Sequence, residues 1–385
     1  MKPLLISTFA AAVMLLFGGV NEVNGDPLTY EVVGDTVTIK DCDENASGEL
    51  YIPSTYEGKP VTSIGEKAFW GCRSLTSVTI PDSVIYIGNW AFRDCSRLTS
   101  VTIPDSVTNI GKWAFYYCSR LTSVTIPDSV TFIGGNAFEG CIRLESVTIP
   151  ESVTSRIGEW TFGRCSSLTN VTIPDSVTSI AAHAFDSCSR LTSVTIGNSV
   201  TTIGGKAFVN CSSLTSVTIP DSVTSIRYSA FQGCSRLTSV TIGSSITSIG
   251  FRTFARCSSL TSITFEGDAP SLEEGVFNNV SSSAKVFIKI GASNFGRIFG
   301  GLPVVVMEEK PKINTVSKSA APFSFSFESK LGSTYIIEAT QDLRQRGKWR
   351  WRKIGGLQGT GFTVEFTDWR EALFQKQYYR LKLVE

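Results

Sequence analysis

Cysteine is the residue whose type and spacing in this sequence most readily suggest chemistry. Nine of the ten cysteines recur every 23 residues, with one interval of 24: Cys72, Cys95, Cys118, Cys141, Cys165, Cys188, Cys211, Cys234 and Cys257. Thiols can form disulfides or bind metal ions, but an odd number of cysteines cannot all pair with one another, and no histidine accompanies them at ligand spacing. We therefore interpret them as buried free thiols that pack as small apolar side chains, and we expect no metal ion or other cofactor.

The single histidine, His183, gives little support for catalysis. Its repeat position is filled elsewhere by very different residues: Lys67, Trp90, Trp113, Asn136, Trp160, Lys206, Ser229 and Arg252. A position that accepts all of these side chains is expected to be exposed, which makes His183 a surface residue. The sequence also has no G-x-S-x-G, H-E-x-x-H or P-loop string. We predict that the protein is not an enzyme.

These positions belong to a 23-residue repeat, which predicts a leucine-rich-repeat solenoid. In each unit a leucine precedes a short strand with alternating inward valine and isoleucine, and a Pro-Asp turn follows. A second extended piece comes next, and then an alanine, a phenylalanine and the cysteine are spaced like one helical turn. Arg156 is the insertion that gives the 24-residue interval. The predicted fold class is a β-rich solenoid with capped ends, followed by a small all-β, sandwich-like domain.

The chain is expected to contain five parts. Lys2 precedes an apolar run, Leu4 to Val20, and small residues follow it, as in a secretory signal peptide. The extended runs on either side of Gly34-Asp35 predict a hairpin, followed by Cys42 outside the cysteine register. We expect a signal peptide at 1–25, an N-terminal cap and partial repeat at 26–60, the solenoid with a C-terminal cap at 61–306, a linker at 307–322 and the β-sandwich at 323–385.

Charge and hydropathy restrict the location and the partners. The formal net charge is +1, which gives no indication of nucleic acid binding. Beyond the apolar run near the N-terminus, no second long apolar stretch predicts a membrane span. We therefore expect an exported protein, secreted or held at the cell surface, that has no transmembrane segment in its mature chain.

The repeat text L-T-S-V-T-I-P-D-S-V-T-S-I-G-x-x-A-F-x-x-C resembles the BspA-like leucine-rich repeats of bacterial surface and secreted proteins, over residues 50 to about 306. The C-terminal text Y-I-I-E-A-T-x-D-L…Y-Y-R-L is similar to a short β-domain found at the ends of exported proteins of environmental bacteria. The first resemblance implies an adhesion or matrix-binding role. It implies a binding scaffold and does not identify the ligand.

Aromatic residues are concentrated in the first half of the repeats and provide the first candidate site. The candidate ligand-binding residues are Trp70, Trp90, Trp113, Tyr116, Tyr117 and Trp160. Exposed aromatic side chains on a rigid face are typical of surfaces that bind proteins or sugar rings. Alternatively, these side chains lie flat over the convex surface and bind nothing.

Two regular rows of polar side chains suggest further hypotheses. An outward row of threonines beside a row of serines resembles the hydroxyl arrays of ice-binding solenoids, although threonine also simply favours strands: Thr79, Thr102, Thr125, Thr148, Thr172, Thr195, Thr218, Thr241 and Thr264. Acidic residues recur at the turns and suggest either calcium binding or turn formation: Asp82, Asp105, Asp128, Glu151, Asp175 and Asp221. We favour turn formation.

The C-terminal domain carries a basic segment, the second candidate site: Arg344, Arg346, Lys348, Arg350, Arg352 and Lys353. If 348–353 is a strand, its cations share one face and its tryptophans the other. That cationic face suits an anionic glycan or cell surface, or it is a solvated edge that prevents aggregation. We expect an adhesin-like recognition protein with an extracellular protein or polysaccharide ligand. A structural envelope protein and an ice binder are the alternatives.

Overall fold

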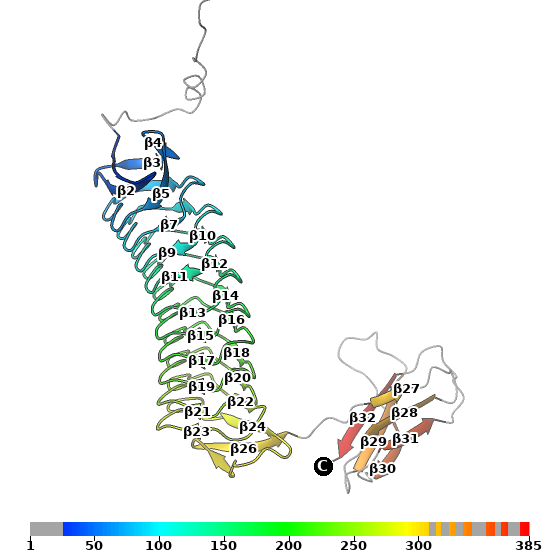
Figure 1. Cartoon of the computed structure of the whole chain (residues 1–385). Coiled ribbons are helices and arrows are strands. Elements are labelled where there is room, and N and C mark those ends of the chain that lie inside the picture. Colours follow the sequence, from blue (N-terminus) through cyan, green and yellow to red (C-terminus); the bar gives the residue numbers. More distant parts are fainter. Residues whose placement is uncertain are drawn as a thin grey trace, which may run out of the picture. The chain divides into compact units, whose positions relative to one another are not determined.

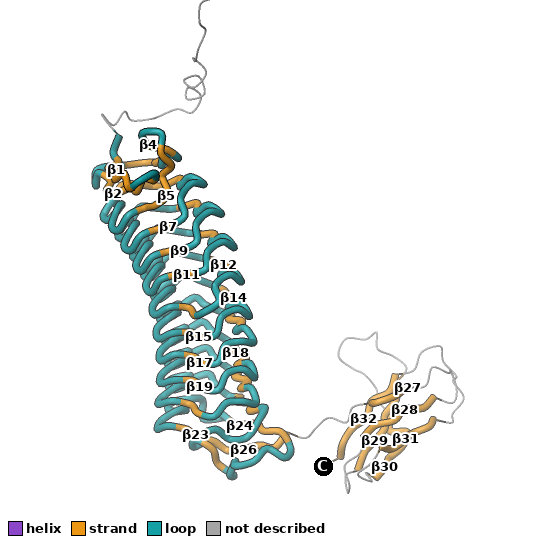
Figure 2. The backbone as a smooth tube through the Cα atoms, in the orientation of Figure 1, coloured by secondary structure: helices purple, strands orange, loops and turns teal. Residues whose placement is uncertain are grey.

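A computed structural model describes residues 26–307, 313–316, 323–328, 334–340, 352–358, 363–368 and 378–384. The expected signal peptide, 1–25, lies outside the described residues. The chain divides into two compact units, Met1–Val305 and Val306–Glu385. Figure 1 shows the first unit as a stack of coils, and Figure 2 shows that strands alternate with turns and loops within each coil.

The N-terminal cap begins with the expected hairpin. Strands β1 (Leu28–Val33) and β2 (Thr36–Cys42) pair antiparallel, and Gly34 in the turn has a φ of 61°, which glycine adopts without a steric penalty. Strand β3 (Ser47–Tyr51) pairs in parallel with β6, so that Leu50 lies opposite Val78. Strands β4 (Thr55–Tyr56) and β5 (Lys59–Ile64) then lead into the coils.

One side of the coils, here called the threonine face, is formed by parallel strands whose valines and isoleucines point inward. Its strands are β6 (Ser74–Thr79), β8 (Ser100–Thr102), β10 (Ser123–Thr125), β12 (Ser146–Thr148), β14 (Asn170–Thr172), β16 (Ser193–Thr195), β18 (Ser216–Ile219), β20 (Ser239–Ile242), β22 (Ser262–Phe265) and β24 (Lys285–Lys289). Identical repeat positions are paired, as for Val124 with Val101. The 23-residue period therefore becomes a spacing of about 4.8 Å between coils.

A second side, the isoleucine face, is formed by two-residue strands. They are β7 (Tyr86–Ile87), β9 (Asn109–Ile110), β11 (Phe132–Ile133), β13 (Arg156–Ile157), β15 (Ser179–Ile180), β17 (Thr202–Ile203), β19 (Ser225–Ile226), β21 (Ser248–Ile249) and β23 (Ser271–Leu272). The inserted Arg156 lies at the start of β13. Both faces are interrupted there, because β11 is not paired with β13 and β12 is not paired with β14.

The third side, the turn face, corrects one sequence expectation. The described residues contain no helix, and the expected helical turn is a run of overlapping turns such as Cys118 N–H to Phe115 O, 3.1 Å. Two residues per coil have positive φ, for example Trp113 and Tyr117, both at 56°, which prevents helix continuation. Alternate N–H groups instead donate to the next coil, as Phe115 does to Ala137 O at 2.7 Å.

The core is a continuous stack that no coil could form alone. Phe69, Phe92 and Phe115 are fully buried, and the ring centroids of neighbouring coils lie 4.7 and 5.1 Å apart with nearly parallel planes. All ten cysteines are buried and free. Cys42 is outside the register in sequence, but it lies at the end of the cysteine ladder, because the Cys72 thiol is 3.8 Å from its carbonyl oxygen.

The C-terminal end of the solenoid is closed by β24, β26 (Leu302–Met307) and β25 (Ile298–Phe299), in that order. Phe265 from the last regular coil packs against Phe295 and Phe299 at 5.4 and 5.5 Å. These aromatic contacts cover the core where the repeat pattern stops.

The second unit consists of two antiparallel three-stranded sheets in the described residues. They are β27 (Ile313–Val316), β28 (Phe323–Glu328) and β31 (Thr363–Asp368), and β30 (Arg352–Gln358), β29 (Thr334–Thr340) and β32 (Tyr378–Val384). Buried Phe327 of one sheet contacts Tyr335 of the other, at a ring distance of 5.0 Å. Strand β27 falls within the stretch expected to be a linker, 307–322. It belongs to the second unit through its antiparallel pairing with β28.

No helix in the described part of the chain has the length and apolar character needed to cross a membrane.

Candidate binding surfaces

The turn face brings together five of the six candidate aromatic residues. We define the aromatic cluster as Trp70, Trp90, Arg93, Trp113, Tyr116 and Tyr117. The rings of Trp90 and Trp113 are parallel, with centroids 5.0 Å apart. Both residues have positive φ, 55° and 56°, so that the turn directs the same repeat position outward in successive coils.

Cations complete this cluster. The Arg93 guanidinium lies between two rings, 5.2 Å from Trp70 and 5.1 Å from Tyr116. It also pairs with Asp94 at 3.2 Å. The Lys67 ammonium lies 5.3 Å from Trp70 and 5.5 Å from Trp90. Each of these contacts is attractive because an aromatic ring face carries negative charge. The cluster is therefore ordered by its own contacts before any ligand binds.

Trp160, the sixth candidate, lies apart from this cluster. Its ring stacks on His183 with a centroid distance of 4.2 Å, and the Arg164 guanidinium lies 5.4 Å from it. Gly163 leaves room for the ring, since a Cβ there would lie 2.6 Å from Trp160 Cε3. His183, expected to be an exposed surface residue, is half-buried because of this stacking.

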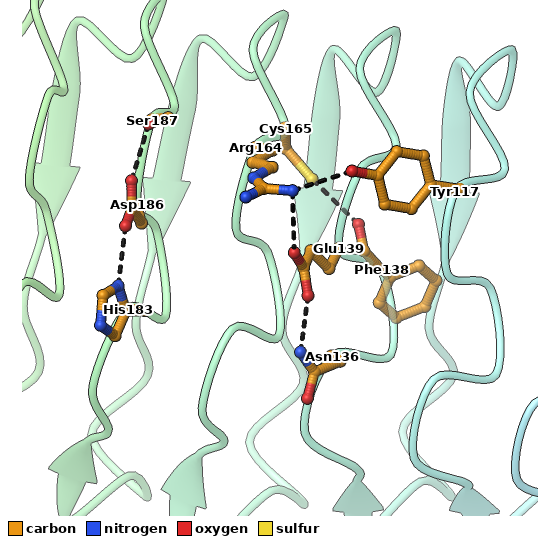
Figure 3. Close-up of polar contacts among 9 residues, drawn as sticks. All are labelled: Tyr117, Asn136, Phe138, Glu139, Arg164, Cys165, His183, Asp186 and Ser187. Carbon is orange, nitrogen blue, oxygen red and sulfur yellow. Dashed lines mark hydrogen bonds and ion pairs between the residues drawn. The ribbon is translucent and has the colours of Figure 1, made fainter.

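A polar network that includes Arg164 joins Trp160 to the aromatic cluster, and Figure 3 shows its hydrogen bonds and ion pair. Arg164 Nη1 donates a hydrogen bond to the Tyr117 hydroxyl at 2.8 Å and lies 3.6 Å from Glu139 Oε1. Asn136 Nδ2 donates to Glu139 Oε2 at 2.6 Å. Glu139 is 6% exposed, and a buried carboxylate requires such partners. The hydrogen bond to Tyr117 raises the pKa of Arg164 above its ordinary value.

The sequence analysis missed this network. Glu139 lies three residues and Arg164 four residues after the variable position of its own coil. Glu139 and Arg164 thus occupy different repeat positions in neighbouring coils. The conformation of the turn brings their side chains together. The repeat positions of Glu139 and Arg164 hold varied residues in the other coils, so that no periodic signal marked this pair.

His183 contacts a carboxylate and lies near a serine, yet the three side chains do not form a catalytic relay. His183 Nδ1 is 2.7 Å from Asp186 Oδ2, and the Ser187 hydroxyl donates to Asp186 Oδ1 at 2.7 Å (Figure 3). A hydrolytic relay requires the hydroxyl to donate to the imidazole, which then acts as the base. Here the carboxylate receives both contacts, so that this group holds the turn in place.

Threonine hydroxyls fall into two kinds. Those just before the strands of the threonine face bond to the preceding coil, as Thr99 does to Thr76 O at 2.9 Å and Thr238 to Thr215 O at 3.0 Å. In contrast, the outward row on the strands, for example Thr102 and Thr218, has no protein partner among the described residues. The first kind stabilises the stack, and the second is available to water or a ligand.

The acidic turn row acts between coils at three sites, and at the first of them Glu151 Oε2 accepts a hydrogen bond from Ser176 N–H at 3.3 Å. Asp175 Oδ1 accepts a hydrogen bond from Asn198 N–H, and Asp221 Oδ1 accepts one from Ser244 N–H, both at 2.6 Å. The bond from Ser244 lowers the pKa of Asp221. The described residues contain no group of three or more side chains arranged to hold a metal ion. For Glu151, Asp175 and Asp221, stabilisation of the turn accounts for the carboxylate.

The basic segment is described only in part. Arg344, Arg346, Lys348 and Arg350 lie outside the described residues, and Arg352 and Lys353 begin strand β30. Most of the strand considered at 348–353 lies outside the described residues, and the described strand β30 comprises Arg352–Gln358. Its backbone pairs with β29, with Arg352 opposite Ala339 and Lys353 opposite Glu338.

Comparisons with known proteins place these features in a family context. The family model for the BspA type leucine rich repeat region matches residues 52–166 and 155–285. No curated protein matches the chain. A leucine-rich-repeat protein of T. pallidum is 33% identical, with 49% of this chain and 88% of that chain covered and a TM-score of 0.46.

Two further solved structures are similar. A leucine-rich-repeat protein of Bacteroides ovatus is 25% identical, with coverages of 74% and 100% and a TM-score of 0.43. A leucine-rich cell surface protein of Faecalibacterium prausnitzii is 25% identical, with coverages of 63% and 94% and a TM-score of 0.32.

Proposed function

Because this chain belongs to the BspA-type leucine-rich-repeat family, we propose that it is a non-catalytic, adhesin-like recognition protein that is secreted or held at the cell surface. The chain is a leucine-rich-repeat scaffold, and proteins with this repeat stack present long, rigid surfaces. The proposed ligand is an extracellular protein, and the proposed site is the aromatic cluster. Glycans remain the competing class of ligand.

The observation that carries this proposal is the ordered alternation of ring and cation at Trp70, Arg93 and Tyr116. Tryptophan, tyrosine and arginine are the residue types that contribute most to binding energy at protein interfaces. Their contacts with one another restrain their rotamers before binding. A ligand therefore loses less conformational entropy on this surface than on one with mobile side chains.

Ring orientation favours a protein over a sugar as the ligand of this cluster. Trp113 stacks on the Trp90 ring, and the Lys67 ammonium lies over the same ring at 5.5 Å from its centroid, so that both groups limit access to its faces. A sugar ring needs a free aromatic face, whereas a protein side chain can also pack against the exposed edges. Trp70, which is 42% exposed, is the most accessible member and would lie at the centre of the contact.

Binding of the full chain to immobilised matrix glycoproteins and polysaccharides tests this proposal. The test variants are Trp70→Ala and the triple change Trp90→Ala, Trp113→Ala and Trp160→Ala. Phe132→Ala is the matched control, because Phe132 is 44% exposed but lies on the isoleucine face. Circular dichroism and melting temperature establish that each variant is folded.

We expect saturable binding to a glycoprotein that both test variants lose and the control keeps. Equal binding by all variants would remove the site from the aromatic cluster. No saturable binding to any surface would favour a structural envelope role over recognition.

The basic C-terminal segment supports a second, weaker mode of attachment, to anionic surfaces. Lys and Arg near such a surface gain electrostatic energy that salt screens. Association with anionic vesicles should fall steeply between low and physiological salt, and salt-independent association would contradict it.

A further inference from the structure

A groove on the threonine face lies far along the chain from the aromatic cluster. It has a volume of about 800 Å³, crosses β16, β18 and β20, and reaches Glu266 just after β22 and Lys289 at the end of β24. Its lining includes three threonines of the outward row, Thr195, Thr218 and Thr241. At the turns that follow β18, β20 and β22, it includes Asp221, Ser244 and Glu266. Neither the repeat family nor the aromatic cluster accounts for this groove.

The hydroxyls of the three groove threonines are free, although other hydroxyls in and near the groove, such as that of Ser244, are not. Thr192, Thr215 and Thr238, just before the strands, each donate to the preceding coil at 3.0 to 3.4 Å. The hydroxyls of Thr195, Thr218 and Thr241, by contrast, have no protein partner among the described residues. Each free hydroxyl can donate one hydrogen bond and accept two. The groove therefore presents donors and acceptors together at every coil.

The charged groups of the groove do not give it one sign. Asp221 is held at one oxygen by Ser244, which donates from its N–H at 2.6 Å and its hydroxyl at 3.0 Å. Glu266 is paired with Lys289. The net field over the groove is weak, so that steering of a charged ligand contributes little. A neutral ligand rich in hydroxyl groups matches this lining best.

We propose that this groove binds a segment of a neutral polysaccharide that runs along the axis of the solenoid. Sugar hydroxyls would exchange hydrogen bonds with Thr195, Thr218 and Thr241. The free oxygen of Asp221 would accept a further bond from a sugar hydroxyl, because ionised acceptors form the stronger hydrogen bonds. One coil advances by about 4.8 Å, so that successive coils contact successive sugars. This site is independent of the aromatic cluster.

Calorimetric titration of the full chain with cellohexaose, mannohexaose and xylohexaose tests the proposal, with an alginate hexasaccharide as the acidic comparison. The test variant is Thr218→Val with Thr241→Val, which keeps side-chain shape and removes two hydroxyls. The matched control is Thr102→Val with Thr125→Val. Those residues belong to the same row but lie outside the groove, and in neither pair does a hydroxyl bond to another protein group in the described residues.

We expect at least one neutral hexasaccharide to bind with a dissociation constant on the order of 0.1–1 mM. The test variant should bind it about tenfold more weakly or worse, as two lost hydrogen bonds imply, while the control binds normally. Asp221→Asn should weaken binding as well.

Three results would overturn the proposal: no binding of any neutral hexasaccharide, equal loss in the test and control variants, or preference for the acidic sugar. The triple tryptophan variant separates this site from the proposed function, because it should lose the protein ligand and keep the sugar.

Discussion

The Cys95 thiol donates a hydrogen bond to the carbonyl oxygen of Phe69 in the preceding coil, 3.0 Å away. The same oxygen accepts the N–H of Cys72 in its own coil, at 3.2 Å. This arrangement continues to Cys257, whose thiol donates to Phe231 at 3.2 Å. The cysteines therefore join neighbouring coils through carbonyl oxygens and need no disulfide.

Removal of one thiol should weaken the junction between two coils. Cys165→Ala deletes the hydrogen bond to Phe138, which is 3.2 Å long, and leaves a small cavity. We expect a loss of about 1–3 kcal/mol in unfolding free energy, measured by urea denaturation under reducing conditions. Ser167→Ala, in the same coil, should change it by less than about 0.5 kcal/mol. Equal losses of unfolding free energy in Cys165→Ala and Ser167→Ala would contradict a special role for the thiol.

Alkaline pH should destabilise the solenoid. Burial raises the pKa of Cys165, Cys188 and Cys211 well above the ordinary 9.0. Unfolded thiols ionise near that value, so that above it unfolding releases protons. The contribution of each buried thiol to the free energy of unfolding is fully present below about pH 9. Above that pH the free energy of unfolding falls by about 1.4 kcal/mol per pH unit for each thiol. Melting temperatures between pH 7 and 10.5 check this. Cys165→Ala should reduce the slope of stability against pH by the amount that one titrating proton contributes. An unchanged slope would contradict a raised pKa of Cys165.

The variable position should tolerate glycine but not β-branched residues. Lys206 has a φ of 57°, a conformation that costs an ordinary side chain about 1–2 kcal/mol and a β-branched one more. Lys206→Val should therefore lower the unfolding free energy by about 1–2 kcal/mol, whereas Lys206→Gly should be neutral or slightly stabilising. Urea midpoints of the two variants decide between this account and one based on the lost charge, which predicts the same effect for both.

Glu139 should matter more for stability than its neighbours on the turn face. Glu139→Ala removes the acceptor for Asn136 and the partner of Arg164, and we expect a loss of about 1–3 kcal/mol. Glu139→Gln keeps an oxygen for Asn136 and should cost less. Thermal unfolding of both variants provides the measurement, with Glu159→Gln, an exposed carboxylate one coil away, as the control.

Much of the fold was predictable because periodicity alone fixes which residues stack. A phenylalanine at a constant repeat position must meet its copies in adjacent coils, as Phe92 and Phe115 do at 5.1 Å. The turn face was less accessible, because alanine, phenylalanine and cysteine at helical spacing occur equally in a run of turns. The positive φ of Trp113 and Tyr117 distinguishes a run of turns from a helical turn. Tryptophan and tyrosine do not indicate a positive φ in the sequence, as a glycine would.

The candidate surfaces were predictable only as rows. Repeat positions place Trp90 beside Trp113, which was expected, and their parallel rings follow. Contacts between different rows, such as Arg164 with Tyr117, depend on how far each side chain leans across the turn. Residue spacing along the chain does not determine that. In the second unit, β27 was not predicted as a strand, because its four residues are too few to show an alternating pattern.

The inserted Arg156 has a mechanical consequence. Both strand ladders are interrupted between the coils of β11 and β12 and those of β13 and β14, and backbone bonds of the turn face, such as Phe138 N–H to Thr161 O at 2.9 Å, hold the coils together there. Under tension along its axis, the solenoid would yield first at this seam. Two shorter rods would result, one with the aromatic cluster and the other with the groove.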